Sequence, residues 1–251
     1  MSQSQWIWVT GASTGIGEAL ARRLLQNGHN VVISARSADK LESLARAFPE
    51  RCHALPVDLT DREALSQVSD RLKTITHHLD SVVINAGTCE YIDVKHFDAA
   101  PFAPVMNINV VGSANTVELA LPFLRESPNR AQVVGVGSMV TVLPLTRSEA
   151  YGASKAAMEY FMHSLRVDLA PEGIDVTLVR PGFVKTPLTD RNDFEMPFLV
   201  EAETAAEHIA RGMARRQRIV QFPWQLVWTM RLISWLPLGW KTALLKKMVK
   251  D

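Results

Sequence analysis

The feature that most constrains the fold of this chain is a regular alternation of short β-rich runs with longer amphipathic stretches. Strands that alternate with helices build βαβ units, so the pattern predicts a parallel sheet with helices on both faces. The expected strands cover 6–10, 30–34, 53–57, 81–85, 131–137, 175–180 and 218–222. The expected helices cover 15–26, 39–47, 61–76, 103–124, 149–170 and 202–215.

Length and composition fit a single domain. The chain has 251 residues, 47% of them apolar, and no Gly/Ser-rich or Pro-rich linker divides it. The predicted fold class is α/β, a Rossmann-type three-layer α/β/α sandwich around a doubly wound parallel sheet of seven strands. Residues 1–222 are expected to form this domain, and residues 223–251 a helical, Trp- and Lys-rich extension of it.

Charge and cysteine content argue against several other classes of protein. The formal net charge is +1, which gives no overall reason to expect a nucleic acid as partner. Cys52 and Cys89 build no disulfide framework, and no Cys/His cluster has metal-ligand spacing, so no metal is expected. No basic segment precedes an apolar stretch near the amino terminus, and the expected location is the cytoplasm. Cys89 is interpreted as a buried thiol, although its position could also line a pocket.

Two segments carry local signals. Thr60 and Glu63 have the spacing of a capping box, in which the Thr60 hydroxyl accepts from the first turn of the following helix. Residues 187–200 have weak periodicity and would lie beyond the carboxyl end of a strand, where ligands bind. They are either a mobile lid over the substrate or an inert surface loop.

A glycine-rich run follows the first predicted strand and opens the first predicted helix. It reads TGASTGIG from Thr10 to Gly17, with Gly-x-x-x-Gly-x-Gly spacing. Glycine permits a tight turn and a close approach of the backbone to a pyrophosphate, which would meet the positive end of the helix. The expected cofactor-binding residues of this run are Gly11, Ser13, Thr14, Gly15, Ile16 and Gly17.

The end of the second predicted strand bears on the choice of cofactor. A carboxylate there would bind the ribose 2′-hydroxyl of NAD(H), whereas an arginine would bind the 2′-phosphate of NADP(H). No acidic residue stands at 34–37 and Arg36 is present, so the sequence favours NADP(H) and leaves NAD(H) open. The alternative for Arg36 is a solvated surface arginine. Residues after the next two strands are expected to border the adenine and its ribose: Asp58, Leu59, Asn85, Ala86 and Gly87.

A tyrosine, a lysine and a serine form the candidate catalytic group. Tyr151 and Lys155 are four residues apart in a predicted helix, and Ser138 stands thirteen residues before Tyr151. One helical turn brings the phenol and the ammonium to the same face. A fixed cation beside a phenol is expected to lower the phenol pKa well below about 10. The group predicts an oxidoreductase that moves a hydride and a proton across a C–O bond.

Together these motifs resemble the compact branch of the short-chain dehydrogenase/reductase family over about residues 5–187. The run from Thr10 to Gly17 matches its TGxxxGxG motif, the residues from Asn85 to Gly87 its NAG motif, and those from Tyr151 to Lys155 its YxxxK motif. Asn109 and Ser138 match the rest of the family's catalytic tetrad. The resemblance also implies that the segment after the sixth strand holds the nicotinamide, through Pro181, Gly182, Val184 and Thr186.

The resemblance implies a role for each tetrad residue. Tyr151 would exchange a proton with the substrate oxygen, and Ser138 would hydrogen-bond that oxygen as the hydride arrives. Lys155 would lower the Tyr151 pKa and hold the nicotinamide ribose, and Asn109 would anchor a water in a proton relay. The expected substrate is a small-molecule ketone, aldehyde or secondary alcohol, which binds to Ser138 and Tyr151.

Each tetrad residue could also have a purely structural role. A Tyr/Lys pair at this spacing is common on helix surfaces, a serine can simply end a strand, and Asn109 could be an uninvolved helical residue. Their joint occurrence beside a glycine-rich turn argues against coincidence. The alternative functions are a catalytically silent NADP(H)-binding regulator and a scaffold protein that acts through its carboxyl-terminal segment. By resemblance, the helices around 103–124 and 149–170 would form a homodimer interface.

The carboxyl-terminal segment departs from the family pattern. From Arg211 onward there are nine Lys/Arg and one Asp/Glu, a net charge of +8. Four tryptophans alternate with Leu, Ile and cations, namely Trp224, Trp228, Trp235 and Trp240, and the segment ends in Lys246, Lys247 and Lys250. This departure puts the usual tetramer interface of the family in doubt.

The same segment predicts a pair of amphipathic helices separated at Pro237. Arg231 and Pro237 interrupt the apolar residues, so a transmembrane helix is not expected. The favoured interpretation is that the pair packs on its own domain or on a partner subunit. The alternative is peripheral contact of residues 223–251 with an anionic membrane at the inner face, which would make a lipophilic substrate more plausible.

Overall fold

The sheet that the alternating pattern predicts is present. In the computed structural model, which describes residues 4–246, seven strands form one parallel sheet in the order β3-β2-β1-β4-β5-β6-β7. The order reverses between β1 and β4, as in a doubly wound Rossmann-type sheet, so the predicted fold class is confirmed. The strands are β1 (Trp6–Thr10), β2 (Asn30–Ser34), β3 (Cys52–Ala54), β4 (Ser81–Ile84), β5 (Gln132–Val136), β6 (Asp175–Pro181) and β7 (Ile219–Phe222).

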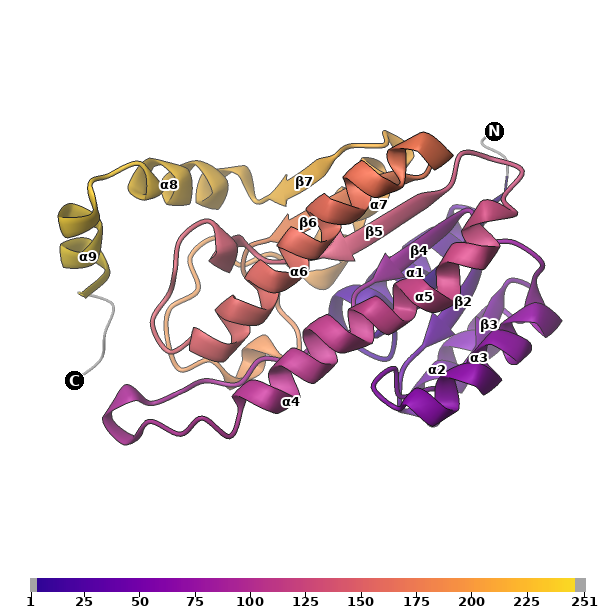
Figure 1. The fold of residues 1–251 in the computed structure, drawn as a ribbon, viewed down its shortest axis with the longest axis horizontal. Coiled ribbons are helices and arrows are strands. Elements are labelled where there is room, and N and C mark those ends of the chain that lie inside the picture. The colour runs from indigo at the N-terminus through magenta and orange to yellow at the C-terminus, as the bar shows by residue number, and fades with distance from the viewer. Residues whose placement is uncertain (1–3, 247–251) are drawn as a thin grey trace.

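Helices cover both faces of this sheet and give the molecule three layers (Figure 1). The main helices are α1 (Gly15–Gln26), α2 (Ala38–Ala47), α3 (Arg62–Ile75), α5 (Gly112–Arg125), α6 (Glu149–Asp168) and α7 (Ala202–Ala214). On one face, α1 and α7 pack together and share an apolar cluster with α2. On the other face, α3, α5 and α6 share a second cluster.

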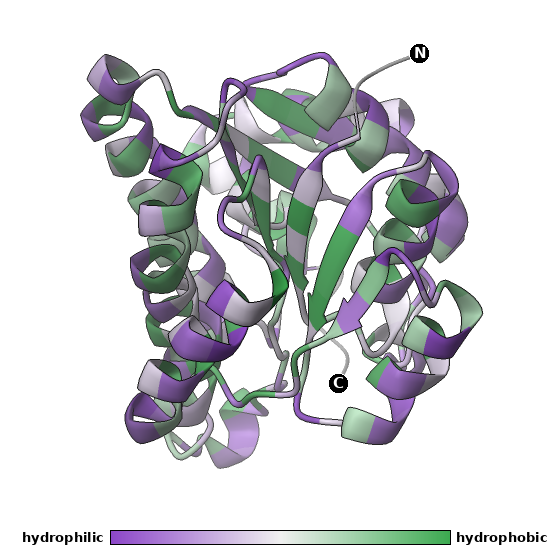
Figure 2. Ribbon diagram, turned by 90° about the vertical axis from the view of Figure 1, so that its right-hand side faces the viewer, coloured by the Kyte–Doolittle hydropathy of each residue, from purple (hydrophilic) through white to green (hydrophobic). Residues whose placement is uncertain are grey.

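The strands are largely apolar because both faces of the sheet are covered. In β1, Ile7 and Val9 belong to the cluster under α1 and α7, whereas Trp8 belongs to the cluster under α5 and α6. Trp8 is fully buried, and its indole N–H donates to Ser34 Oγ at 2.8 Å. Figure 2 shows the hydrophobic strands between the two helix layers, which is typical of a parallel sheet.

The amino end of α3 corrects the predicted capping box. Asp61 is the capping residue, and its carboxylate accepts from the amides of Glu63 and Ala64 at 3.0 and 3.3 Å. Thr60 instead donates its hydroxyl proton to Asp58 at 2.7 Å. The helix begins one residue later than the capping-box spacing implies, so Asp61 takes the position from which a side chain can reach these amides.

The long helix predicted over 103–124 is interrupted. α4 (Phe102–Met106) leads through a π-helical turn, Asn107–Val111, into α5. A π turn inserts one extra residue into a helix and often marks a functional site. The third strand is shorter than predicted, although the amides of Leu55 and Val57 continue the hydrogen bonding to the neighbouring segment at 2.9 and 3.0 Å.

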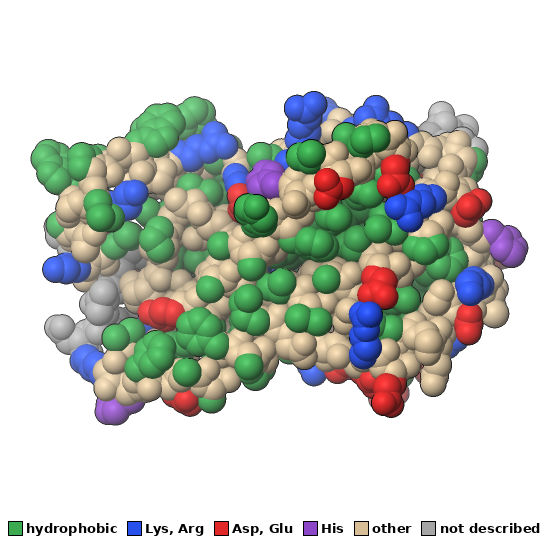
Figure 3. Space-filling view, viewed as in Figure 1, with side chains coloured by type: hydrophobic (Ala, Val, Ile, Leu, Met, Phe, Trp, Pro, Cys, Tyr) green, Lys and Arg blue, Asp and Glu red, His purple; other side chains and the backbone are tan. Residues whose placement is uncertain are grey.

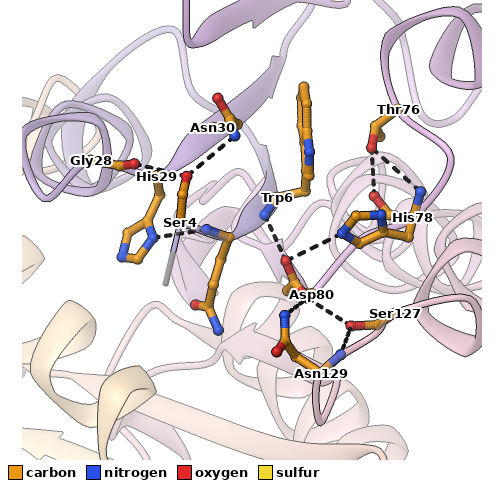
Figure 4. A network of polar contacts seen from close by, with 11 residues as sticks. Ser4, Trp6, Gly28, His29, Asn30, Thr76, His78, Asp80, Ser127 and Asn129 are labelled. Carbon is orange, nitrogen blue, oxygen red and sulfur yellow. Dashed lines mark hydrogen bonds and ion pairs between the residues drawn. The ribbon is translucent and has the colours of Figure 1, made fainter. Parts of the chain in front are cut away.

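A buried carboxylate ties together the amino ends of β1 and β4 (Figure 4). Asp80 is fully buried and accepts from the Trp6 amide at 2.8 Å. The Ser127 hydroxyl and the Asn129 side-chain amide donate to it at 2.7 and 2.9 Å, and His78 Nε2 lies 3.7 Å away. This network lies at the edge of the sheet opposite the carboxyl ends of the strands, where it stabilises the fold.

Two further helices project beyond β7 at one end of the molecule (Figure 1). They are α8 (Trp224–Ser234) and α9 (Leu238–Lys246), so the predicted pair separated at Pro237 is present. Within residues 4–246, no helix combines the length and the apolar character needed to cross a membrane. Lys247 and Lys250 of the predicted basic end lie outside the described residues.

Candidate active site

A cleft of about 500 Å³ opens at the carboxyl ends of the strands, close to the reversal between β1 and β4. Doubly wound sheets bind their ligands in this position. The cleft brings together most of the residues predicted from the sequence: Gly11, Ser13, Thr14, Gly15, Ile16, Arg36, Asp58, Leu59, Asn85, Ala86, Gly87, Ser138, Tyr151, Lys155, Pro181, Gly182, Val184 and Thr186. Gly17 and Asn109 are buried and do not line it.

Glycines shape the turn between β1 and α1. Gly15 has a φ of 59°, in the left-handed region that favours glycine. A Cβ on Gly17 would lie 2.3 Å from the carbonyl oxygen of Gly11 and 2.4 Å from Nδ2 of Asn85. Asn85 occupies that space and donates to the carbonyls of Thr10 and Gly11 at 3.1 Å each. Asn85 therefore braces the turn from the neighbouring strand, and Gly17 makes room for this brace.

The start of α1 is suited to an anion. The capping residue Thr14 makes no side-chain hydrogen bond to the first turn of the helix. The first amides of a helix have no partner within it, and they carry its positive dipole end. Together with the glycine turn that lines the same cleft, these amides fit the pyrophosphate of a dinucleotide.

Arg36 and Asp58 lie together in the cleft. Arg36 is exposed just beyond β2. Burial alone would raise the pKa of the Asp58 carboxyl, but the Thr60 hydroxyl and amide donate to it at 2.7 and 2.9 Å. These hydrogen bonds and the charge of Arg36 leave the Asp58 pKa below its ordinary value. The cleft thus presents an exposed guanidinium beside an ionised carboxylate.

Asn109 is fully buried in the π turn. Its side chain accepts from the Thr88 amide at 2.8 Å and donates to the Thr88 carbonyl at 2.9 Å and to Ser154 Oγ at 2.8 Å. A Cβ on Gly87 would lie 3.1 Å from Asn109 Oδ1 and 3.5 Å from Lys155 Nζ. A side chain at Gly87 would therefore crowd Asn109, and glycine lets the asparagine and the lysine lie against the backbone here.

The candidate catalytic hydroxyls meet at the end of the cleft. Ser138 follows β5, and its Oγ accepts from the Val140 amide at 3.2 Å. Tyr151 lies in the first turn of α6, and its phenol is hydrogen-bonded to the Ser138 side chain. Lys155 lies one turn later and is 5% exposed. Its Nζ donates to the Val136 carbonyl at 2.9 Å and lies 5.9 Å from the centre of the Tyr151 ring.

The ionisation of this pair differs from the sequence-based expectation. Burial raises the pKa of Tyr151 to about 12, although the hydrogen bond to Ser138 acts in the opposite direction. Burial also lowers the pKa of Lys155 to about 8. The expected lowering of the Tyr151 pKa by the lysine is therefore wrong for this structure, because the loss of solvent disfavours the charged form of both groups.

A second cavity of about 110 Å³ adjoins the cleft, and Ser138 and Tyr151 line both. Its wall is mostly apolar and comes from the loops after β4, β5 and β6 and from α8. The side chains that line it include Met139, Leu145, Phe183, Phe194, Leu226 and Met230. The two hydroxyls thus lie where a dinucleotide-sized cleft and an apolar pocket meet.

Sequence reasoning missed the contribution of α8 to this pocket. Leu226 and Met230 share one face of the helix, and this four-residue spacing was the signal that could have found it. Cys89 is buried and also lines the pocket, so both interpretations of this cysteine hold. Burial raises the pKa of the Cys89 thiol to about 11, which keeps it protonated at neutral pH.

Residues 187–200 contribute Leu188, Thr189, Asn192 and Phe194 to the lining of the same pocket. The Phe194 ring contacts the rings of Tyr91 and Phe183, with centres 6.1 and 6.0 Å apart. Asp193 accepts from Arg147 at 2.8 Å. The segment is therefore held against the loops around the pocket, and its action as a mobile lid stays a prediction.

Comparison with known proteins identifies the family. The model of the short chain dehydrogenase family matches residues 5–196. The chain belongs to the short-chain dehydrogenase family. An uncharacterized oxidoreductase of Myxococcus xanthus is 38% identical to it over 232 residues, which cover 91% of each chain. The chain is accordingly an oxidoreductase of this family, and the family resemblance drawn from its motifs is confirmed.

Solved structures of similar proteins hold either nicotinamide cofactor. The RhlG/NADP active-site complex of Pseudomonas aeruginosa is 31% identical, with a TM-score of 0.71 over 75% of this chain and 77% of that one. A short chain dehydrogenase/reductase of Burkholderia phymatum in complex with NAD is 20% identical, with a TM-score of 0.82 over 92% of each chain. These likenesses support the Rossmann fold and leave the choice between NADP and NAD to the residues of this chain.

Proposed function

We propose that this short-chain dehydrogenase is an NADP(H)-dependent reductase of a ketone or aldehyde, which can also oxidise the corresponding secondary alcohol. The observation that carries the proposal is that Ser138 and Tyr151 line both the cleft and the apolar pocket. A carbonyl oxygen bound at this junction would meet two hydroxyl groups that are already hydrogen-bonded to each other. NADP(H), when bound in the cleft, would supply the hydride.

Tyr151 acts as the general acid in this reduction. Its pKa of about 12 keeps the phenol protonated at neutral pH, and the protonated form is the one that can donate. Ser138 donates a hydrogen bond to the substrate oxygen as negative charge develops there. In the reverse reaction the same phenol would have to accept a proton from the alcohol, and its raised pKa disfavours the phenolate that does so.

Lys155 and Asn109 have supporting roles: Lys155 binds the cofactor, and Asn109 takes part in returning a proton to the Tyr151 phenol. With a pKa of about 8, most Lys155 side chains are protonated at pH 7 and can bind the ribose hydroxyls of the nicotinamide nucleoside. Asn109 would anchor a water that links Lys155 to solvent and passes protons toward Tyr151. Each turnover needs such a path, because Tyr151 must regain the proton that it donates.

The cofactor assignment rests on Arg36. Its exposed guanidinium lines the cleft just beyond β2, where a 2′-phosphate would find a cation and no acidic residue at 34–37. The NADP complex of RhlG, at 31% identity, supports the same choice. The other cleft residues would hold the remaining parts of the cofactor. The first turn of α1 would bind the pyrophosphate, while Asp58, Leu59 and Ala86 would border the adenosine and Pro181, Gly182, Val184 and Thr186 the nicotinamide.

Tyr151→Phe tests the proposed reaction. We expect this variant to lose turnover by about a thousandfold or more, because the proton donor is gone, while its affinity for NADPH changes by less than about threefold. The assay is NADPH oxidation with a panel of carbonyl compounds that ranges from polar to long-chain. Tyr160→Phe, which changes an exposed tyrosine of the same helix, is the control.

Two results would contradict this proposal. Wild-type activity in Tyr151→Phe would remove Tyr151 from the mechanism. Tight NADPH binding by the wild type without turnover of any carbonyl would favour a silent NADP(H)-binding regulator instead.

We also propose a cytoplasmic homodimer that pairs through α5 and α6. The exposed side of α6 carries small and apolar residues at helical spacing, namely Ala153, Ala156, Tyr160, Ser164 and Val167. Figure 3 shows hydrophobic side chains along the face that these two helices form. Residues 1–222 would be the catalytic domain, and residues 223–251 its helical extension. Tyr160→Glu, with sedimentation velocity as the readout, should convert the dimer to a monomer.

A further inference from the structure

Helix α8 is apolar on two opposite faces, and within residues 4–246 the protein covers one of them. On the covered face, Leu226, Val227 and Met230 are 5 to 7% exposed and pack against Met139 and Leu143. A helix that is hydrophobic all round is normally buried on every side. The uncovered face of α8 therefore needs an occupant.

The uncovered face is rich in tryptophan. Its residues on α8 and at the C-cap of this helix are four, four and three positions apart, which keeps them on one side of the helix. They are Trp224, Trp228, Leu232 and Trp235, with exposed fractions of 69, 52, 57 and 73%. Three apolar residues of α9 are exposed as well: Leu238, Trp240 and Leu244, at 77, 72 and 39%. We call the four residues Trp224, Trp228, Leu232 and Trp235 the tryptophan face, and Figure 3 shows hydrophobic side chains at this end of the molecule.

Positive charge accompanies the tryptophan face. The charged residues of 223–246 are Arg231, Lys241 and Lys246, and the sequence has no acidic residue between Glu207 and Asp251. The Arg231 guanidinium lies 5.9 Å from the centre of the Trp228 ring. The face thus combines large aromatic surfaces with cations that have no acidic neighbour along the chain.

We propose that the tryptophan face docks on an anionic lipid surface, with α8 and α9 lying in the plane of the interface. Tryptophan favours this environment because its ring is apolar while its N–H can reach water and headgroups. Lysine and arginine complete the composition of an interfacial helix. With eleven residues, α8 is about 16 Å long, which is too short for a hydrocarbon layer of about 30 Å.

A second copy of this chain fits the tryptophan face less well. A two-fold interface brings the same patch of both subunits together. Arg231, Lys241 and Lys246 would then face the same cations of the partner without an acidic residue to pair with. An anionic membrane supplies the missing negative charge, so charge complementarity selects lipid as the occupant.

The covered face of α8 connects this docking surface to the active site. Leu226 and Met230 line the apolar pocket beside Ser138 and Tyr151, and the exposed Trp224 and Trp228 belong to the same two turns of helix. Docking would bring the wall of the pocket to the lipid surface. The substrate class that follows is an apolar carbonyl compound taken from the lipid phase, an extension that rests on the proposed reductase function.

Cosedimentation of the full-length protein with vesicles tests the docking without any turnover. We expect binding to phosphatidylcholine vesicles that contain phosphatidylglycerol, no binding to phosphatidylcholine alone, and weaker binding as salt is added. Trp224→Ser with Trp228→Ser should weaken binding by at least about tenfold. Lys241→Gln and Lys246→Gln should each weaken it by about fivefold.

Matched controls distinguish loss of the tryptophan face from loss of any exposed aromatic residue and from unfolding. Phe97→Ser removes an exposed aromatic residue outside α8 and α9 and should leave vesicle binding unchanged, and thermal unfolding should show that every variant is folded. Failure of the wild type to bind phosphatidylglycerol vesicles would overturn the proposal. So would sedimentation showing that the tryptophan substitutions dissociate a dimer, because the face would then belong to a second copy.

Turnover separates this inference from the proposed function. The wild type and the double tryptophan variant should reduce a short, water-soluble ketone equally fast, because Trp224 and Trp228 do not line the pocket. Only the wild type should be accelerated when a long-chain ketone is presented in phosphatidylglycerol vesicles. Vesicle binding without any turnover would reject the reductase and retain the docking, whereas equal rates of both proteins on the vesicle-borne ketone would reject the substrate extension.

Discussion

Replacing Lys155 with methionine is expected to change how the stability of the protein depends on pH. The lysine is 5% exposed, and its Nζ donates to the Val136 carbonyl at 2.9 Å. Burial lowers its pKa from 10.5 to about 8, so the charged form is less favourable in the folded protein than in the unfolded chain. Methionine has a similar length and no charge, and therefore removes this penalty.

The size of the effect follows from proton linkage. Below pH 8 Lys155 is protonated in both the folded and the unfolded protein. Its buried charge then lowers the free energy of unfolding by about 3 kcal/mol, which follows from pKa values of 10.5 in the unfolded chain and about 8 in the folded protein. Between pH 7 and pH 10 the folded protein releases the proton while most unfolded chains keep it, so stability rises with pH. Relative to Lys155→Met, the wild type should gain about 2 to 3 kcal/mol over this range. The lost hydrogen bond to Val136 adds an offset that does not depend on pH.

Urea unfolding at several pH values between 7 and 10 measures this difference. Subtracting the variant from the wild type removes the titration of every other group. Lys73→Met is the control, because the Lys73 side chain is 62% exposed and its substitution should leave a nearly constant difference. A difference for Lys155→Met that stays within about 0.5 kcal/mol from pH 7 to pH 10 would refute the buried, destabilised ammonium. Direct NMR titration of the Lys155 side chain gives an independent value.

Three further substitutions test other parts of the structure. Gly17→Ala should weaken NADPH binding by at least about thirtyfold, because its Cβ would lie 2.3 Å from the Gly11 carbonyl oxygen. The control is Gly239→Ala, whose Cβ would meet nothing within 4 Å and which should bind NADPH normally. Isothermal titration with NADPH compares the two variants. Arg36→Gln should raise the Kd for NADPH about ten- to a hundredfold and the Kd for NADH less than about threefold. An equal rise of both Kd values would show that Arg36 does not bind the 2′-phosphate. Asp80→Ala should lower the free energy of unfolding by about 3 kcal/mol, because three donors lose a buried carboxylate. The control is Asp70→Ala at an exposed site, which should change the free energy of unfolding by less than about 0.5 kcal/mol. Urea titrations measure both. An Asp80→Ala protein as stable as the wild type would show that this network does not stabilise the fold.

Much of the fold could be predicted because its signals are local. A strand covered on both faces is mostly apolar, and β1, β2 and β6 begin where the sequence predicts them. Helix α1 has the bounds expected from the glycine run and the periodicity that follows it. The errors fall where neighbouring residues compete for one role. Asp61 rather than Thr60 caps α3, and a π turn around Asn109 divides a helix whose sequence pattern is continuous.

The candidate site was predictable for the residues that belong to short motifs. The positions of Ser138, Tyr151 and Lys155 follow from the end of a strand and one turn of a helix. The apolar pocket was not predictable in the same way, since its wall combines Met139, Phe183 and Leu226 from separate parts of the chain. Spacing along a sequence carries no information on which loops converge in space.

The sequence by itself determined the layered α/β architecture, the glycine turn and the order of the catalytic residues, because each depends on residues that are neighbours along the chain. Only the tertiary structure decided the ionisation of Tyr151 and Lys155 and the position of α8. Burial depends on every segment that packs around a group, and here it raises the pKa of the phenol although a lysine stands one helical turn away. In the same way, the fold covers one apolar face of α8 and leaves its tryptophans exposed.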